Sequence, residues 1–120
     1  MKAYTDIEQS KMLESILPIE SSDMKYPYFG DGQYGTTALF GEPIEFSGGK
    51  DVPCWSLAAL LNAMPESIDR YDLTIIHCSP IEWGCVYQDI NGNIKYECYV
   101  DNQVDACVEM ILKLKEKDLL

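Results

Sequence analysis

Two runs of alternating apolar and polar residues, Trp83–Asp89 and Ile94–Val100, flank the dipeptide Asn91-Gly92. An Asn-Gly pair between such runs is the strongest short-range signal for a β-hairpin with a two-residue type I′ turn. With that turn, six side chains share one side of the hairpin in three facing pairs: Tyr87 with Tyr96, Cys85 with Cys98, and Trp83 with Val100. We expect that side to face the core, because side chains alternate across a strand.

Helices are expected at both ends of the chain. Asn102 is a suitable N-cap for a C-terminal helix, and Asp105 stands three residues on, where a capping-box acid would be. Near the start, Thr5 and Glu8 form a T-x-x-E capping box. That pattern predicts a helix that reaches about Leu17, where a proline follows.

A third helix is expected in the middle of the chain. Asp51 is placed to cap it and Pro53 suits its first turn. The segment 54–64 is apolar on nearly all sides, which predicts a buried central helix. Eight side chains from the helices and strands are expected to be almost fully buried: Trp55, Leu57, Leu60, Leu61, Ile75, Trp83, Val108 and Ile111.

These elements predict one α+β domain over residues 1–120. A strand at 71–78 joins the 83–100 hairpin in an antiparallel sheet, which packs against the buried central helix and the C-terminal helix. Residues 18–50 are less regular, with short extended pieces expected at 36–40 and 43–46.

The charge balance narrows the class of partner. There are 20 acidic and 9 basic side chains, for a net charge of −11. A surface of that sign repels nucleic-acid backbones and anionic membranes, so we expect neither as a direct partner. No apolar run approaches the roughly 18 residues of a membrane span, and the first residues lack a secretory apolar segment. We therefore expect a cytoplasmic protein.

The five cysteines do not form a metal-site pattern. No two are spaced as C-x-x-C, and His77 is the only histidine. Zinc sites normally use such close pairs, so we expect free thiols and no metal. His77 and Cys78 are neighbours on the predicted strand and point to opposite faces, which opposes a catalytic dyad.

Two further patterns are interpreted structurally. Residues 30–35 match G-x-G-x-x-G, but no strand-turn-helix unit surrounds them, so we expect a glycine turn and no nucleotide site. Asp101, Asp105 and Glu109 share one helical face, which we interpret as solvated. No catalytic, cofactor-binding or metal-binding residue is therefore assigned.

An aromatic cluster within the irregular region is the candidate site for a protein partner: Tyr26, Tyr28, Phe29 and Tyr34. Aromatic side chains are enriched at protein interfaces. The alternative is that the same rings fold back over the sheet. We expect a mixture, with Tyr28 or Phe29 buried as an anchor and Tyr26 and Tyr34 partly exposed. Two nearby acids, Asp23 and Asp31, would form a polar rim that favours a basic partner.

Three stretches of the chain resemble a known group of proteins. They are KAYTDIEQSKMLESILPIESSDM at 2–24, DVPCWSLAALLNAMP at 51–65 and VDNQVDACVEMILKLKEKDLL at 100–120. They resemble a family of small proteins encoded by gut Bacteroidetes and their phages or mobile elements. Similar sequences often have proline where this chain has Gln103. The family has no established activity, so the resemblance implies only a bacterial cytoplasm and a prophage or transferred element.

Three functions from different classes follow. The leading hypothesis is a small cytosolic, non-enzymatic accessory protein that acts by binding another protein. The first alternative is an acidic inhibitor that mimics DNA in a nucleic-acid-binding site, which would need carboxylates in two rows spaced like phosphates. The second alternative is an enzyme that uses carboxylates or His77, which would need a pocket with convergent polar groups.

Overall fold

The computed structural model describes residues 2–46 and 48–120. These residues form two compact units, one of residues 3–60 and one of residues 61–120 together with Lys2. The helices are α1 (Ile7–Glu14), α2 (Leu57–Ala63), in which the boundary between the units falls, and α3 (Gln103–Glu116). All strand pairs are antiparallel, so the predicted α+β class is confirmed.

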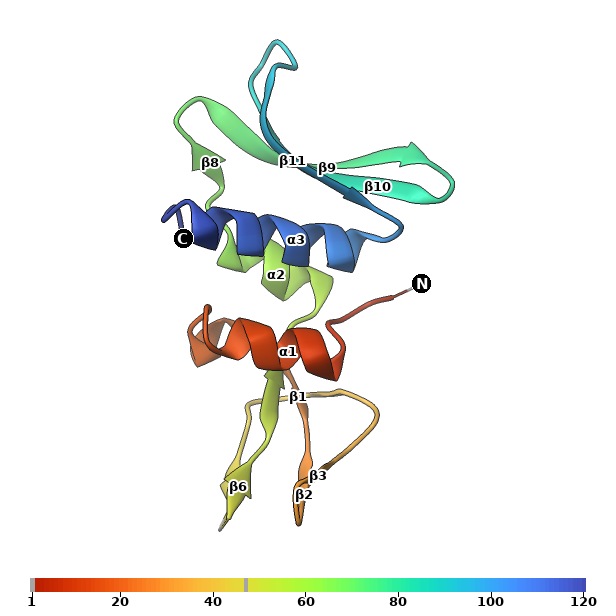
Figure 1. Ribbon diagram of the computed structural model, residues 1–120, viewed down its shortest axis with the longest axis vertical. Coiled ribbons are helices and arrows are strands. Elements are labelled where there is room, and N and C mark those ends of the chain that lie inside the picture. Colours follow the sequence, from red (N-terminus) through yellow and green to blue (C-terminus); the bar gives the residue numbers. More distant parts are fainter. Residues whose placement is uncertain (1, 47) are drawn as a thin grey trace. The chain divides into compact units, whose positions relative to one another are not determined.

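The unit of residues 61–120 is a four-stranded sheet with a helix on one face. The strand order is β11 (Ile94–Val100), β10 (Glu82–Gln88), β9 (Tyr71–Ser79) and β8 (Ser67–Ile68). Helix α3 packs against β10 and β11, as Figure 1 shows. The predicted arrangement of C-terminal helix on hairpin is therefore confirmed.

The register of the predicted hairpin is correct, and its turn is not. Cys85 faces Cys98 and the two neighbouring predicted pairs are also present. The register shifts at Tyr87/Gln88, so the turn is longer than the expected two residues. Gly92 has a positive φ of 82°, but Asn91 does not belong to the residues with positive φ, as a type I′ turn would require. The carboxylate of Asp89 organises this longer turn by accepting hydrogen bonds from the backbone N–H groups of Asn91 and Asn93.

The predicted cap of the C-terminal helix is confirmed. Asn102 is the N-cap of α3, and its side-chain oxygen accepts a 2.8 Å hydrogen bond from the backbone N–H of Asp105. The Asn102 side-chain amide in turn donates to the Asp105 carboxylate at 2.8 Å. The buried face of α3 includes Val108 and Ile111.

The unit of residues 3–60 is built from short strands. A three-stranded sheet has the order β4 (Leu39–Phe40), β1 (Met24–Tyr26) and β7 (Val52–Cys54). The unit also contains two small hairpins: β2 (Tyr28–Gly30) with β3 (Gln33–Tyr34), and β5 (Glu45–Phe46) with β6 (Gly49–Lys50). Helix α1 packs against β7, and the short 3-10 helix η1 spans Ile19–Ser21.

The central helix is shorter than expected. It begins at Leu57 because the preceding residues, Pro53 among them, pair with β1 as strand β7. A proline is tolerated there because β7 is an edge strand. The cap is also different: the backbone N–H of Ala59 donates to the Ser56 hydroxyl, so Ser56 caps α2 in place of Asp51.

The first helix begins one residue later than the capping pattern predicts. The capping box of α1 consists of Asp6 and Gln9, and the helix ends at Glu14 instead of Leu17. Thr5 is fully buried, and its hydroxyl accepts from the backbone N–H of Trp55 and contacts the hydroxyl of Ser10. Its side chain is thus committed to a buried polar cluster and cannot cap the helix.

The predicted core is half correct. Four of the eight side chains are buried as expected: Trp55, Leu60, Val108 and Ile111. The other four are only partly buried: Leu57, Leu61, Ile75 and Trp83. Helix α2 is therefore not buried on all sides, and Ala58 and Asn62 are exposed on it.

Candidate functional site

Tyr26 is a buried residue of the candidate cluster, and the expectation of partial exposure is wrong for it. Its exposed fraction is 4%, and its hydroxyl donates a 2.8 Å hydrogen bond to the backbone carbonyl of Thr5. Its ring packs edge-on against Tyr4 with the centroids 6.5 Å apart. Burial raises the pKa of Tyr26 above its ordinary value, so the phenol stays neutral and serves as a hydrogen-bond donor.

Tyr28 joins the two small hairpins of this unit. Its hydroxyl accepts a hydrogen bond from the backbone N–H of Gly32 at 3.2 Å and donates to the carbonyl of Gly48 at 3.3 Å. Its ring lies over Gly49, where an added Cβ would be only 2.5 Å from the ring. The ring and hydroxyl of Tyr28 thus have a structural role in holding the hairpins together.

Behind Tyr28, the buried carboxylate of Asp51 connects three segments. It accepts hydrogen bonds from the backbone N–H groups of Tyr28 and Ile44 at 2.8 and 2.9 Å. The ammonium group of Lys25 lies 3.7 Å from the same carboxylate. A carboxylate that is 1% exposed needs such partners, and here they set the conformation of the chain beneath the aromatic cluster.

Phe29 and Tyr34 form the accessible part of the cluster. Phe29 is 73% exposed and Tyr28 is half-buried, so the expectation that one of them is a buried anchor is wrong. Tyr34 is half-buried, as expected, and its ring contacts Tyr28 with centroids 5.3 Å apart. A Cβ on Gly35 would lie 3.5 Å from the tip of the Phe29 ring, so Phe29 stands next to Gly35.

A cavity of about 430 Å³ opens beside these rings. It is lined by residues of α1 and of the segment around β3: Asp6, Ile7, Glu8, Lys11, Tyr26, Tyr34, Gly35 and Thr36. We call Tyr26, Phe29, Tyr34 and Gly35 the aromatic surface. Two of the four predicted residues, Tyr26 and Tyr34, therefore line one cavity. Phe29 lies next to the lining residue Gly35, and the half-buried Tyr28 supports Tyr34 by ring contact.

The charges around the aromatic surface differ from the predicted rim. Asp23 does not belong to it, because its carboxylate accepts from the backbone N–H and hydroxyl of Ser56. Asp31 is exposed in the β2–β3 turn, as a rim residue should be. Glu8 lines the cavity from α1, and the Lys11 ammonium lies 5.1 Å from the Tyr34 ring centroid. Sequence reasoning missed the contribution of α1, since residues distant in the chain give no local signal of their contact.

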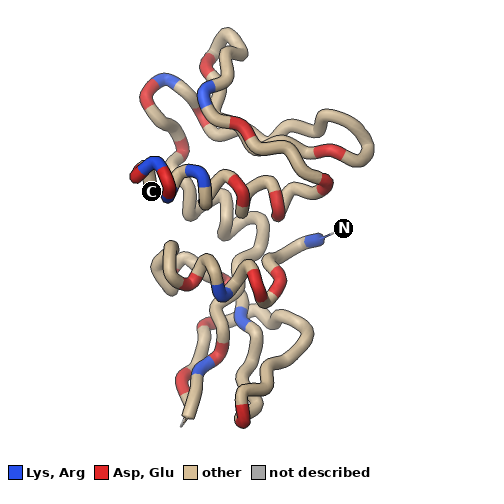
Figure 2. Tube along the Cα trace, in the orientation of Figure 1, with Lys and Arg blue, Asp and Glu red and all other residues tan. Residues whose placement is uncertain are grey.

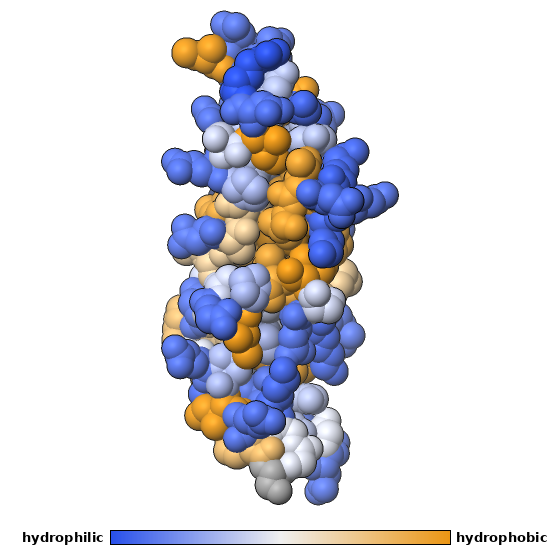
Figure 3. All heavy atoms as spheres, turned by 90° about the vertical axis from the view of Figure 1, so that its left-hand side faces the viewer, coloured by the Kyte–Doolittle hydropathy of each residue, from blue (hydrophilic) through white to orange (hydrophobic). Residues whose placement is uncertain are grey.

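Further exposed apolar side chains in the same unit were also missed. Leu39, Phe40, Ile44 and Phe46 are between 49% and 76% exposed. Figure 3 shows hydrophobic groups among hydrophilic ones at its lower end, around the β5–β6 hairpin. Short edge strands leave these side chains without a covering layer, so the unit presents more apolar surface than its sequence pattern predicted.

The alternative chemistries place their residues differently. The His77 ring stacks on Trp83 with centroids 3.9 Å apart, while Cys78 is exposed. Residues 30–32 form the β2–β3 turn with positive φ angles, which agrees with a glycine turn. Within residues 2–46 and 48–120, no three His, Cys, Asp or Glu side chains are grouped as metal ligands. No helix in the same described ranges is long and apolar enough to cross a membrane.

All five cysteines are free thiols, and three of them are buried. Cys54 lies at the Thr5 cluster, with its sulfur 3.4 Å from the Thr5 hydroxyl. Burial raises its pKa, and a hydrogen bond with Cys107 together with burial raises the pKa of Cys85. A raised pKa disfavours the thiolate, so these sulfurs are poor nucleophiles.

No protein-family model, curated protein or solved structure matches this chain. Among the residues singled out from the sequence, the aromatic surface is the one place where exposed rings, a cavity and charged side chains of the described chain meet.

Proposed function

We propose that this protein acts by binding another protein through the aromatic surface, without catalysing a reaction. The observation that carries the proposal is Phe29, a large apolar side chain that is 73% exposed and lies next to Gly35, a residue that lines a cavity of about 430 Å³. Exposed apolar groups that gather beside a concavity are typical of interaction sites. Hydrogen bonds of Tyr28 and Asp51 hold the chain around the aromatic surface in place. This preorganisation lowers the entropy lost on binding.

The chemistry of the surface suggests the kind of partner. An apolar or aromatic side chain of the partner would pack on Phe29 and enter the cavity beside Tyr34. Glu8 and Asp31 would favour basic residues around that contact, in keeping with the net charge of −11. The resemblance to proteins of gut Bacteroidetes and their mobile elements belongs to this proposal, as does a cytoplasmic, accessory role.

The distribution of charge favours protein binding over DNA mimicry. Within each unit, Figure 2 shows Lys and Arg interspersed with Asp and Glu along the chain. A mimic of DNA needs rows of carboxylates at the spacing of phosphates. An enzyme would need catalytic groups that converge in a pocket. The cavity lined by Tyr26 and Tyr34 contains these two rings, one lysine and the carboxylates of Asp6 and Glu8.

The proposal is tested with two matched phenylalanine variants. Phe29→Ser removes the exposed ring of the aromatic surface, whereas Phe40→Ser removes a ring of similar exposure, 76%, on β4 of the same unit. Wild type and both variants are immobilised and exposed to a gut Bacteroidetes lysate. A candidate partner is then purified, and its binary affinity for the three proteins is measured by calorimetry.

We expect a partner that binds wild type and Phe40→Ser alike and binds Phe29→Ser at least about tenfold more weakly, as for an interface hot spot. Circular dichroism should show that all three proteins have the same secondary structure, because both rings are solvent-exposed. Equal binding of the purified partner by Phe29→Ser and wild type would contradict the proposal.

A further inference from the structure

Strand β11 leaves one of its two edges open. It is the outermost strand of the four-stranded sheet and pairs only with β10 among the described strands. At seven residues, Ile94–Val100, it is as long as β10 and longer than any strand of the other unit. An open edge of this length carries unpaired backbone N–H and C=O groups that can pair with a further strand.

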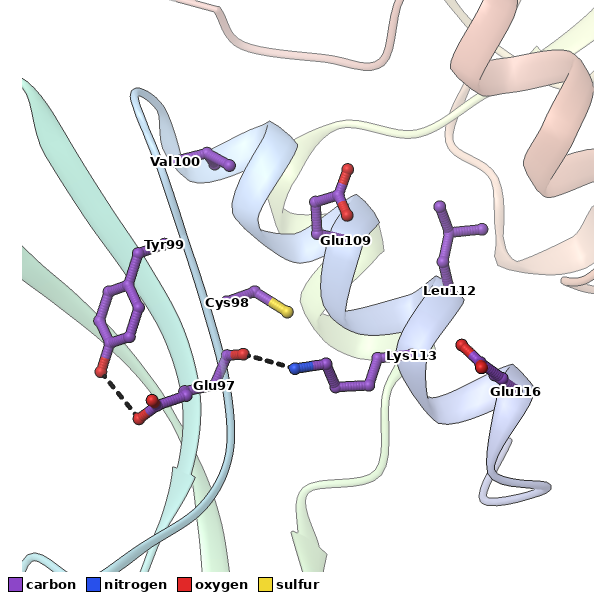
Figure 4. A pocket seen from close by; sticks show the side chains of 8 residues that line it. All are labelled: Glu97, Cys98, Tyr99, Val100, Glu109, Leu112, Lys113 and Glu116. Carbon is purple, nitrogen blue, oxygen red and sulfur yellow. Dashed lines mark hydrogen bonds between the residues drawn. The ribbon is translucent and has the colours of Figure 1, made fainter.

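One hydrogen bond shows in which direction the backbone groups of β11 point. The carbonyl oxygen of Glu97 accepts a 2.7 Å hydrogen bond from the side-chain ammonium of Lys113, and Figure 4 shows this oxygen on the α3 side, away from β10. Backbone groups alternate along an antiparallel strand. The N–H and C=O groups of Glu97 and Tyr99, which lie in the regular part of the β10–β11 register, therefore face the open edge.

A groove of about 360 Å³ runs between this edge and helix α3. Its strand wall is formed by residues 97–100, and its helix wall by Glu109, Leu112, Lys113 and Glu116. These helical positions have the spacing i, i+3, i+4 and i+7, so they share one face and span about 10 Å. Three residues of an extended chain cover about the same length.

The groove is lined by acidic side chains, one lysine and a few apolar groups. Figure 4 shows Glu109 and Glu116 on the helix on either side of Lys113, while the Glu97 carboxylate points away from the groove and accepts a hydrogen bond from the Tyr99 hydroxyl. Leu112 contributes apolar surface between the two helical carboxylates. Two carboxylates and one ammonium group leave an excess of negative charge, so a cationic side chain would be favoured there.

The position of the Lys113 ammonium group indicates that the groove suits a hydrogen-bond donor with a positive charge. Its ammonium group stands where the backbone N–H of an added strand would donate to Glu97, and it lies among the carboxylates that would attract a cation. It is a long, half-buried side chain that can swing out at little cost. Lys113 thus has the two roles that a bound basic strand would have. It donates a hydrogen bond to the Glu97 carbonyl, and it places a positive charge near the groove carboxylates.

We propose that an extended, lysine-rich segment of another protein adds to the open edge of β11 as a fifth strand of the sheet. Its backbone pairs with Glu97 and Tyr99, and its basic side chains enter the groove toward Glu109 and Glu116. This mode combines backbone pairing for affinity with side-chain pockets for selectivity. It concerns the unit of residues 61–120 and is independent of the aromatic surface.

A second copy of this chain is a poorer occupant. Pairing of two β11 strands would bring together two grooves with the same excess of carboxylates, on molecules that each carry a net charge of −11. Like charges brought together oppose association. The excess of negative charge therefore selects a cationic strand over a copy of the same one.

The test uses a synthetic probe, the peptide Ac-KVKVKVK-NH2, at about 0.15 M salt, where long-range attraction between exposed charges is largely screened. The control peptide has the same sequence and a methyl group on every backbone nitrogen, which keeps the charge and prevents strand pairing. Affinity is measured by calorimetry, and hydrogen exchange of backbone amides is followed by NMR. We expect the control to bind more than about tenfold more weakly, and the amides of Glu97 and Tyr99 to exchange more slowly with the unmethylated probe.

Variants of the protein separate the groove from general charge. Glu109→Gln with Glu116→Gln should weaken the probe about tenfold, because two groove carboxylates are neutralised. Glu42→Gln with Glu45→Gln changes the net charge equally at exposed positions in the other unit and should change affinity less than about twofold. Lys113→Ala should strengthen binding a few-fold, because it frees the Glu97 carbonyl and removes a competing cation.

Each contrary outcome would overturn the proposal. These are equal affinity for the methylated and unmethylated peptides, slowed exchange at amides elsewhere than β11, and equal weakening by both pairs of Gln substitutions. An absence of binding at millimolar peptide concentration would also overturn the proposal. Dimers of the free protein that protect the β11 amides would identify a second copy as the occupant and would also overturn it.

Discussion

The carboxylate of Asp51 accepts a 2.8 Å hydrogen bond from the backbone N–H of Tyr28, 23 residues earlier in the chain. The same carboxylate accepts from the backbone N–H of Ile44, so one buried side chain holds two loops in place. Tyr28 in turn supports the aromatic surface through its ring contact with Tyr34. The shape of the proposed partner site thus depends on an acid outside the site.

Replacing Asp51 should destabilise the protein strongly. Asp51→Ala leaves two backbone N–H groups without their acceptor, at a cost of roughly 2–4 kcal/mol of unfolding free energy. Asp51→Asn keeps one acceptor oxygen and should cost less. Urea unfolding measures both, with Glu42→Ala as an exposed acidic control that should change stability little. Equal stability of Asp51→Ala and the control would show that the carboxylate has no such structural role.

Gly49 should tolerate no side chain while Tyr28 is present. An added Cβ would lie 2.5 Å from the Tyr28 ring, so Gly49→Ala should cost about 1–3 kcal/mol through displacement of that ring. In a Tyr28→Ala background the same substitution should cost much less, because the obstructing ring is gone. A double-mutant cycle by thermal or urea unfolding measures this coupling. Additive effects of the two substitutions would contradict the predicted contact.

Two neighbouring leucines of α2 should differ in their contribution to stability. Leu60 is fully buried, so Leu60→Ala should cost roughly 2–5 kcal/mol by loss of contacts and creation of a cavity. Leu61 is only partly buried, and Leu61→Ala should cost clearly less. Paired urea titrations test the difference. A larger loss for Leu61 would mean that the face of α2 is assigned incorrectly.

The five thiols should react in a defined order. Cys78 is exposed, Cys98 is partly buried, and the other three are buried: Cys54, Cys85 and Cys107. In the native protein at pH 8, Ellman's reagent should therefore modify Cys78 fastest, Cys98 more slowly, and the rest only after denaturation. Cys78→Ser should remove the fast phase. A fast phase that survives this substitution would place an accessible thiol elsewhere.

The turn of the β10–β11 hairpin should give a stability term that depends on pH. Hydrogen bonds from the Asn93 side chain and backbone, with a further one from Asn91, lower the pKa of Asp89 below its ordinary value. A lowered folded-state pKa stabilises the protein above the unfolded value of about 4, and this contribution is lost as the pH falls through the folded-state pKa. Asp89→Asn should therefore be less stable than wild type at pH 7, with a gap that narrows below about pH 4. Urea titrations from pH 7 to pH 3 measure it, and a constant gap would contradict the assignment.

Local pattern was enough to predict the hairpin and the last helix. The alternation around Cys85 and Cys98 sets which side chains face each other, because a shift by one residue would turn every apolar side chain to the wrong face. Asn102 and Asp105 are three residues apart and cap α3 by themselves. The aromatic cluster was also recognisable as a candidate site from its composition alone.

Contacts between distant residues decided the rest. Pro53 and its neighbours form a strand and not a helix because β1, nearly thirty residues earlier, pairs with them. Tyr26 is buried where its hydroxyl reaches the carbonyl of Thr5, a partner that composition does not reveal, whereas Phe29 of the same cluster is exposed. The sequence by itself determined elements whose stabilising contacts lie within a few residues. Tertiary structure decided which side chains are free to bind, because exposure depends on what the remote parts of the chain cover.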